Sequence, residues 1–341
     1  MGPPRWRSVG RAILRRLSAK AVILMYHRVV DVERDPWGLC VSPKNFAEHL
    51  AVLCRRAHPI SLKELTRCHG RGRVPRRGIV VTFDDGYADN LYQAKPLLER
   101  YQVPATVFIT TGQLGSGRGF WWDELERILL EPRRLPSTLR LEINDTAFEW
   151  ELGAASEYRA EDVDRERGLR PWEAEPGSRL AFYYSVWRRL RSLTDDMRRP
   201  LLDRLAAWAY VEHEASPPSR AMDIDELHRI TDGGWVDIGA HTVTHPYLSA
   251  HPIGFQKAEI EMSKAQLEQI LGRPVDSFAY PYGNYGPESV PLVSATGFHC
   301  ACSVVQDSVW YRTDRFRFPR FSVEDWSGEE FEKRLLLWLH S

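Results

Sequence analysis

Val80-Val81-Thr82-Phe83-Asp84-Asp85-Gly86-Tyr87 is a short apolar run that ends in two adjacent carboxylates and a glycine. The β-branched and aromatic residues before Asp84 predict a buried strand, and Gly86 lets the backbone turn after it without a Cβ penalty. Both acids are therefore expected where a strand ends, at a sheet edge or a barrel mouth. Because neighbouring carboxylates repel each other, we expect a metal ion beside them to compensate the charge.

The segment Gly239-Ala240-His241-Thr242-Val243-Thr244-His245-Pro246 offers further metal ligands. Residues 236–240 predict another short strand, so that His241 also follows a strand. If a helical turn comes next, His241 and His245 lie on one face of it. Two imidazoles and one carboxylate form a facial set that leaves coordination positions open, as a hydrolytic zinc site requires. The second carboxylate is then free to act as a base.

Thr82-Phe83-Asp84-Asp85-Gly86 followed by His241-Thr242-Val243-Thr244-His245 resembles the polysaccharide deacetylase family, also called carbohydrate esterase family four or the NodB homology domain. The family patterns are T-F-D-D-G and H-[ST]-x-x-H, in that order, and Phe278-Ala279-Tyr280-Pro281-Tyr282-Gly283 is similar to its third motif. The resemblance runs from about Ile23 to the C-terminus. It implies a distorted parallel (β/α) barrel that hydrolyses an N-acetyl group from an amino sugar.

The resemblance also implies roles for individual residues. Asp84 is the general base, and Asp85, His241 and His245 bind a divalent metal, for which we expect zinc. The backbone N–H of Tyr282 helps to hold the oxyanion.

The sequence departs from the family pattern at two places. Ala279 stands where the third motif often has an arginine that braces the base, and we expect Arg320 to replace it because a cationic partner keeps a carboxylate ionised. The family's Leu-x-His near the C-terminus, which supplies the general acid, has no counterpart in this sequence. His27 is our candidate acid instead, since it follows a predicted strand over residues 21–26 and parallel strands of a barrel end on one face.

Other residues are candidates for the same region. His299 is an alternative acid, and Asp325 with Trp326 are candidates for the surroundings of the site. His340, at the end of the chain, is expected to fray.

Strand and helix patterns alternate through most of the chain, which predicts an α/β fold. Between about residues 112 and 225 this alternation stops, and we expect a mainly helical insertion over the barrel mouth, with a hairpin at 139–150 and helices at 180–190 and 200–210. Charged residues dominate a link at 157–175. Trp121 and Trp122 either stack on a sugar or anchor the insertion in a core.

The composition excludes several classes of protein. The 341 residues include 46 basic and 46 acidic side chains, so that charge gives no reason to expect nucleic acid. With 43% hydrophobic residues and no apolar run of spanning length, a globular enzyme is expected. The five cysteines are odd in number and contain no C-x-x-C pair, which argues against a disulfide framework and for a reducing compartment.

Residues 1–20 are basic and contain apolar side chains at near-helical spacing. They predict either an amphipathic helix on an anionic membrane surface or a helix packed on the domain 21–341. The apolar run at 21–26 is too short for a secretory signal, so we expect a cytoplasmic protein, with peripheral contact at the inner face of the membrane in the first case.

The predicted function is metal-dependent removal of an N-acetyl group from an N-acetylated sugar, an oligosaccharide or a lipid-linked glycan. Two alternatives stay open. One is a hydrolase that removes another acyl group, such as formyl, from a lipid-linked sugar. The other is a catalytically inert carbohydrate-binding module.

Overall fold

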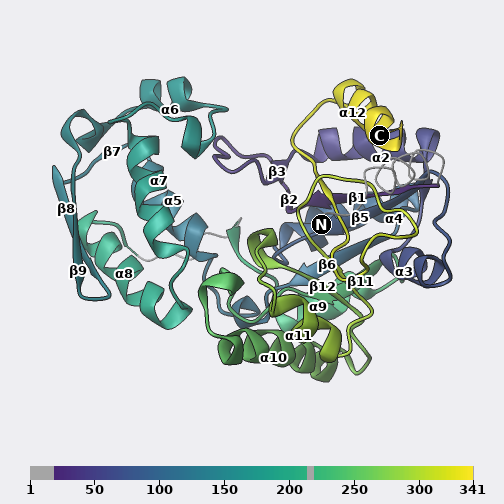
Figure 1. Cartoon of the computed structure of the whole chain (residues 1–341). Coiled ribbons are helices and arrows are strands. Elements are labelled where there is room, and N and C mark those ends of the chain that lie inside the picture. The colour runs from purple at the N-terminus through teal and green to yellow at the C-terminus, as the bar shows by residue number, and fades with distance from the viewer. Residues whose placement is uncertain (1–18, 213–218, 341) are drawn as a thin grey trace, which may run out of the picture.

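The computed structural model describes residues 19–212 and 219–340 of the chain. Figure 1 shows two lobes, one built on a sheet and the other mainly on helices. The predicted amphipathic segment 1–20 lies almost wholly outside the described residues. Among the helices of the described residues, none combines the length and the apolar character that crossing a membrane requires.

A curled, parallel sheet forms the core of the first lobe. Its strands run in the order β13-β12-β11-β6-β5-β1-β14, every pairing along this path is parallel, and β4 pairs with β5 beside it. A single bridge from Cys302 to Phe318 connects β13 with the segment before β14. The sheet is thus a half-closed barrel, and the predicted α/β barrel fold is confirmed. The strands are β1 (Ala21–Tyr26), β4 (His58–Pro59), β5 (Gly78–Phe83), β6 (Ala105–Ile109), β11 (Val236–Ala240), β12 (Ser277–Ala279), β13 (Cys300–Cys302) and β14 (Phe321–Ser322).

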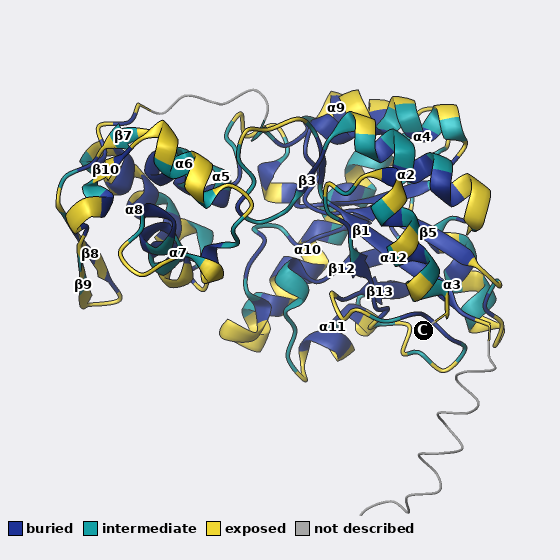
Figure 2. Ribbon diagram, turned by 90° about the horizontal axis from the view of Figure 1, so that it is seen from above, coloured by how far each residue is buried: buried dark blue, intermediate teal, exposed yellow. Residues whose placement is uncertain are grey.

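Helices cover the outside of this sheet, and their inner faces are buried whereas their outer faces are exposed (Figure 2). Local sequence signals set their ends. Ser42 caps α2 by accepting from the Asn45 N–H, and Asp223 and Glu226 form a capping box at α9. Gly272, in the left-handed conformation, ends α10. The helices are α2 (Pro43–Arg56), α3 (Leu62–Gly70), α4 (Lys95–Tyr101) after a π-helical turn η1 (Asn90–Ala94), α9 (Ile224–Thr231), α10 (Ile253–Leu271), α11 (Ser289–Ala295) and α12 (Gly328–His340).

The second lobe is formed by the inserted segment and has a hydrophobic core of its own, to which Tyr87 of the first lobe also belongs. The hairpin predicted at 139–150 is present as β8 and β9. The segment 157–175, predicted as a charged link, instead contains β10, α6 and a 3₁₀ turn. The elements are α5 (Trp121–Leu130), β7 (Arg133–Arg134), β8 (Thr138–Ile143), β9 (Thr146–Glu151), β10 (Glu157–Tyr158), α6 (Ala160–Glu166), η4 (Pro171–Glu173), α7 (Arg179–Leu190) and α8 (Asp195–Trp208).

Arg179 explains why the segment around 157–175 is ordered despite its charge. The Arg179 side chain is 1% exposed and donates hydrogen bonds to the carbonyl groups of Leu129, Ala155 and Ser156. It therefore ties α7 to the end of α5 and to the turn before β10. A buried arginine that satisfies several carbonyls is a contact between distant segments, which charge patterning along the sequence does not reveal.

Candidate active site

The carboxyl ends of the parallel strands deliver polar side chains into one cavity of about 450 Å³. His27 follows β1, Asp84 and Asp85 follow β5, and His241 follows β11. His245 and Tyr282 reach the same cavity from the loops after β11 and β12. The strand-end argument therefore holds for His27, Asp84 and His241, because strands of a parallel sheet present their carboxyl ends on one face, whereas Tyr280, which follows β12, does not line the cavity.

Asp85, His241 and His245 form the one group of metal-ligating side chains among the described residues whose ligand atoms lie within 4.8 Å of one another. Asp85 Oδ1 is 3.3 Å from His245 Nε2 and 3.6 Å from His241 Nε2. His241 Nδ1 donates a hydrogen bond of 2.7 Å to the Ala279 carbonyl, which leaves the Nε2 lone pair directed to the group. Asp85 Oδ1 is buried and has no hydrogen-bond partner in the described structure. A buried acceptor facing two imidazole nitrogens fits a divalent cation such as zinc.

The loop that carries the two histidines is not the helical turn that we considered from their spacing. Thr242 and His245 have φ values of 64° and 56°, in the left-handed region, and the segment contains no helix. Asp85, at 74°, and Tyr282, at 56°, share this conformation. Such backbone is costly for residues other than glycine, and its concentration around one cavity is typical of a functional site.

Glu259 on α10 holds this loop in place. Its Oε2 accepts hydrogen bonds of 2.8 Å from the backbone N–H groups of Val243 and Thr244, and its Oε1 accepts from the Thr244 hydroxyl. Gly112 closes the other side, since a Cβ there would lie 2.7 Å from the Val243 carbonyl oxygen. The strained loop is therefore held in place by Glu259 and Gly112, which lie outside the histidine motif.

Asp84 and Arg320 form a buried pair with two parallel hydrogen bonds, Nη1–Oδ1 of 2.7 Å and Nη2–Oδ2 of 2.8 Å. Arg320 also donates to the Ser303 carbonyl and the Thr82 hydroxyl. Burial by itself raises the pKa of Asp84, but the charge of Arg320, with a smaller effect of His241, outweighs it and lowers the pKa to about 2. Asp84 is thus a fixed carboxylate across the physiological range, with Arg320 in the position that the substitution at Ala279 led us to expect.

The aromatic ring of Tyr282 packs against the metal-ligand group. Its centroid lies 4.4 Å from that of His245, and its hydroxyl accepts a hydrogen bond of 3.2 Å from Trp121 Nε1. The Tyr282 backbone turns in a 3₁₀ segment, η7 (Pro281–Gly283), directly after β12. The side chain therefore supports His245, whereas the oxyanion role of the backbone N–H stays a prediction.

His27 lines the cavity, and its carbonyl accepts a hydrogen bond from the Asn90 side chain. Burial lowers the pKa of its imidazole to about 4, despite the opposing effect of Asp84. His27 is therefore neutral at neutral pH. A role as general acid requires that it first receives a proton.

The other candidate side chains for the site lie outside the cavity. His299 is on the surface, with Nδ1 3.5 Å from Asp276. Asp325 accepts hydrogen bonds from Ser42 at the start of α2, and Trp326 packs against Trp338, 6.1 Å away between ring centroids. His340 is exposed at the end of α12.

Trp121 and Trp122 are buried, at 3% and 5% exposed, so that both anchor the second lobe in its core. Trp122 also lines the cavity, and its ring lies 4.7 Å from His245. The alternative of a free stacking platform does not hold for Trp121, which is absent from the cavity wall.

Much of the remaining cavity wall was not predicted. It is mostly aromatic and comes from the loop before β3 (Cys40–Val41), from the second lobe and from the loop after the histidines. The sequence is rich in tryptophan, which suits an aromatic cavity wall, but this abundance does not indicate which tryptophans line the cavity. The residues are Trp37, Trp172, Tyr184, Trp187, Arg191 and Tyr247.

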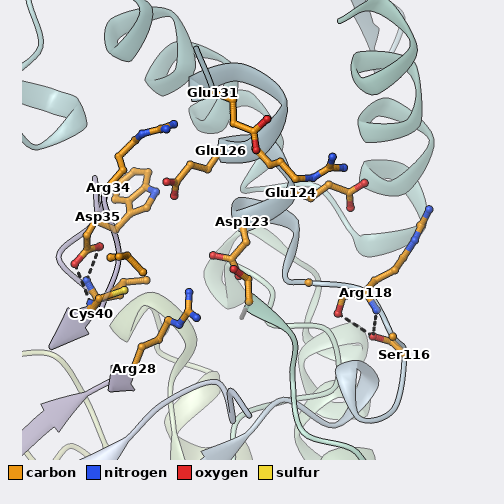
Figure 3. Close-up of a pocket in the computed structure, with 17 residues that line it drawn as sticks. Arg28, Arg34, Asp35, Cys40, Ser116, Arg118, Asp123, Glu124, Glu126 and Glu131 are labelled. Atoms are coloured by element: carbon orange, nitrogen blue, oxygen red, sulfur yellow. Dashed lines mark hydrogen bonds between the residues drawn. The ribbon is translucent and has the colours of Figure 1, made fainter. Parts of the chain in front are cut away.

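A second cavity, of about 410 Å³, lies beside the first and shares Trp37 and Leu39 with it. Figure 3 shows Asp123 and Glu126 of α5 facing Arg28 and Asp35 of the sheet lobe across it. Burial raises the pKa of Asp123 to about 7 and that of Glu126 to about 8. None of the proposed metal ligands lines this cavity.

Comparisons with known proteins find relatives that are named as deacetylases. The polysaccharide deacetylase family matches residues 71–135 and 207–301. The poly-beta-1,6-N-acetyl-D-glucosamine N-deacetylase of Staphylococcus aureus (strain N315) is 39% identical over 110 residues, which are 28% of this chain and 38% of that protein. The chain thus spans well under half the length of this curated relative.

Solved structures show the same fold at low sequence identity. The deacetylase PplD of Streptococcus pyogenes, in complex with acetate, superposes with a TM-score of 0.59 at 16% identity, over 94% of this chain and 99% of that chain. IcaB from Ammonifex degensii superposes with a TM-score of 0.55 at 16% identity, over 95% and 98% of the two chains. The family segments contain Asp84, Asp85, His241 and His245, and the chain belongs to the polysaccharide deacetylase family.

Proposed function

We propose that this protein is a metal-dependent hydrolase that removes an N-acetyl group from an amino sugar in a glycan or a glycan precursor. The observation that supports it most directly is the buried ligand group Asp85–His241–His245 beside an ionised Asp84 in a single cavity. The staphylococcal relative is named for N-deacetylation of poly-N-acetylglucosamine, which suits the same reaction.

Asp85, His241 and His245 would hold a divalent cation, and zinc suits their nitrogen and oxygen donors. When bound, such a cation polarises a carbonyl and lowers the pKa of a water molecule. The three ligands are all buried and line the cavity, so that water can reach the group through it. The left-handed backbone at Asp85 and His245 fixes the directions of their side chains before substrate arrives.

Asp84 would accept the proton of the attacking water as general base. Its low pKa makes it a weak base, but Arg320 keeps it ionised and fixes both oxygens. The Tyr282 N–H would stabilise the charge that develops on the carbonyl oxygen. The leaving amine needs a proton, and His27, neutral at rest, would pass on the one that Asp84 has taken up.

The decisive experiment measures acetate release with zinc added, in the native protein and in Asp84→Asn. Chitooligosaccharides, nucleotide-linked N-acetylglucosamine and a lipid-linked N-acetylamino sugar serve as substrates. We expect release from at least one of them, and its loss in Asp84→Asn while metal content is unchanged. Activity retained in Asp84→Asn would refute the base assignment.

The two alternatives give different results in the same assay. Release of formate from a formylated lipid-linked sugar, without release of acetate, would favour the other deacylase, and co-sedimentation with anionic vesicles that depends on residues 1–20 would suit it. Sugar binding without release of any acid would favour the inert module. Retention of the base and all three ligands argues against that module, since a binding protein has no use for them.

A further inference from the structure

Arg191 is a cation in the wall of the active-site cavity, supplied by the second lobe. It is the C-terminal cap residue of α7, whose backbone N–H donates to the Trp187 carbonyl. Its guanidinium carbon lies 5.3 Å from the ring centroid of Trp187 and 4.9 Å from that of Tyr247. The two rings, one from each lobe, hold the guanidinium by cation–π contact.

Among the residues that the structure describes, no carboxylate forms an ion pair with Arg191. Over residues 19–212 and 219–340, none of the ion pairs and side-chain hydrogen bonds involves its guanidinium. In contrast, Arg198 and Arg199 of the neighbouring α8 both lie within 4 Å of Asp195. Aromatic faces fix the position of Arg191 but leave its N–H donors available, which is the state required to bind an anion.

The two carboxylates in the cavity wall, Asp84 and Asp85, are placed to pair with other cations. The charge of Asp84 is compensated by Arg320. The other polar side chains of the wall near Asp85 include the imidazoles of His27, His241 and His245, and no further carboxylate of the described residues lines the cavity. With a divalent cation on Asp85, this leaves an excess of positive charge at one end of the cavity and Arg191 at the other.

A chain of ring contacts connects the two ends. The Tyr282 ring lies 4.4 Å from that of His245 and 5.9 Å from that of Tyr247, which in turn contacts Arg191. Two aromatic rings thus connect Arg191 to a metal ligand, so that a substrate whose acetamide lies at the metal ligands can extend toward Arg191. Trp172, 57% exposed, and Trp187 offer aromatic faces in the same wall.

We propose that Arg191 binds an anionic group, a phosphate or a carboxylate, carried by the substrate next to its N-acetylated sugar. This proposal rests on the proposed function and narrows its substrate class: neutral polymers of N-acetylated sugars are then poorer substrates than acidic glycans or phosphate-linked sugars. A purely structural role is the competing explanation, because a cation at the C-terminus of α7 also stabilises the helix.

The experiment compares three substrates by kcat/KM for acetate release: methyl N-acetylglucosaminide, N-acetylglucosamine 1-phosphate, and an oligosaccharide with a uronate next to N-acetylglucosamine. Each is measured with native protein, Arg191→Gln and the control Arg188→Gln. Arg188 is an exposed arginine of α7 whose guanidinium lies 5.9 Å from Tyr184 and which does not line the cavity. Thermal midpoints of all three proteins report on folding.

We expect the native protein to prefer one acidic substrate over the neutral one by about ten- to a hundredfold, the range of a charge-assisted hydrogen bond. Arg191→Gln should abolish this preference, mainly through KM, and leave the neutral substrate nearly unaffected. Arg188→Gln should keep it. The phosphate and uronate substrates separate the two sources of the anion.

Equal rates on neutral and acidic substrates in the native protein would overturn the proposal, and so would a preference that survives in Arg191→Gln. Both outcomes leave the deacetylase function intact. If no substrate releases acetate, the proposed function fails. Calorimetric binding of glucosamine 1-phosphate against methyl glucosaminide then tests Arg191 alone: a phosphate preference lost in Arg191→Gln supports the anion site, and an absent or unchanged preference overturns it.

Discussion

At the scale of residues, the two adjacent carboxylates Asp84 and Asp85 have different surroundings, and their proposed roles follow from that difference. Asp84 and Asp85 are both 3% exposed, and burial alone disfavours the charge of each. Arg320 stabilises the charge of Asp84, whereas Asp85 faces only imidazoles, and its pKa is raised by burial and by Asp84. Among the described residues, Asp85 therefore has no cationic partner of its own, whereas Asp84 has Arg320. This difference supports the proposed roles, Asp85 as metal ligand and Asp84 as general base.

Replacing Arg320 should change the pH dependence of the enzyme. In the native protein the lowered pKa of Asp84 keeps the base ionised at all pH values above about 4. In Arg320→Gln burial dominates, the pKa rises, and activity falls by about tenfold for each unit by which the pKa exceeds the assay pH. In profiles of kcat/KM from pH 5 to 9, the value for Arg320→Gln should therefore fall at the acidic end. We expect a smaller fall in Arg320→Lys, which keeps the charge. Parallel profiles for native protein and Arg320→Gln would contradict this.

The ligand group can be tested without an activity assay. Zinc that binds only the folded protein raises the thermal midpoint, since binding at a hundred times Kd stabilises by about 2.7 kcal/mol. We expect this rise in native protein after treatment with a chelator, and we expect its loss in His241→Ala and His245→Ala. His299→Ala, on the surface, is the matched control. A full zinc-induced rise in His241→Ala would remove that residue from the ligand group.

At the scale of elements, the ends of strands were predictable and the loops between them were not. The apolar runs before Asp84 and His241 specify strands β5 and β11, and a parallel sheet then brings their carboxyl ends together. The loop after β11 could not be predicted because its shape depends on Glu259, from the next helix, and on Gly112, from a distant strand end. The aromatic wall was equally hidden, because Trp37 and Trp187 meet only in the folded chain, 4.4 Å apart.

Glu259→Ala should loosen the histidine loop while leaving α10 intact. Three hydrogen bonds of 2.8 Å are lost, and two of them come from backbone N–H groups between the histidines. Loss of such supporting contacts commonly weakens metal binding by about 10- to 100-fold. Zinc affinity by competition with a chromophoric chelator measures this. Glu261→Ala, an exposed position on the same helix, is the control, and equal affinity in the two variants would assign the loop's shape to other contacts.

At the scale of the whole molecule, the second lobe supplies part of the wall of the proposed active site. Trp122, Trp187 and Arg191 come from the second lobe, and the metal ligands come from the first. The change of pattern near residue 112 indicated an insertion, but not which of its side chains would face the site. The second cavity lies along the same junction, with α5 on one side and the segment from Arg28 to Cys40 on the other (Figure 3).

Glu126 makes the stability of this junction depend on pH. Burial, and then the neighbouring Asp123, raise its pKa from 4.5 to about 8 in the folded protein. The folded state thus holds a proton that the unfolded state releases near pH 4.5, and the stability linked to that proton is lost as pH rises from about 4.5 through 8.

Glu126→Gln removes the titration, so we expect the variant to be more stable than the native protein at pH 8.5, by about 1–3 kcal/mol, and nearly equal to it at pH 5. Thermal midpoints at both pH values measure the difference, with Glu142→Gln, exposed on β8, as control. A gain of the same size at pH 5 would mean that packing rather than ionisation is responsible, because only the charged form of Glu126 disfavours the closed junction.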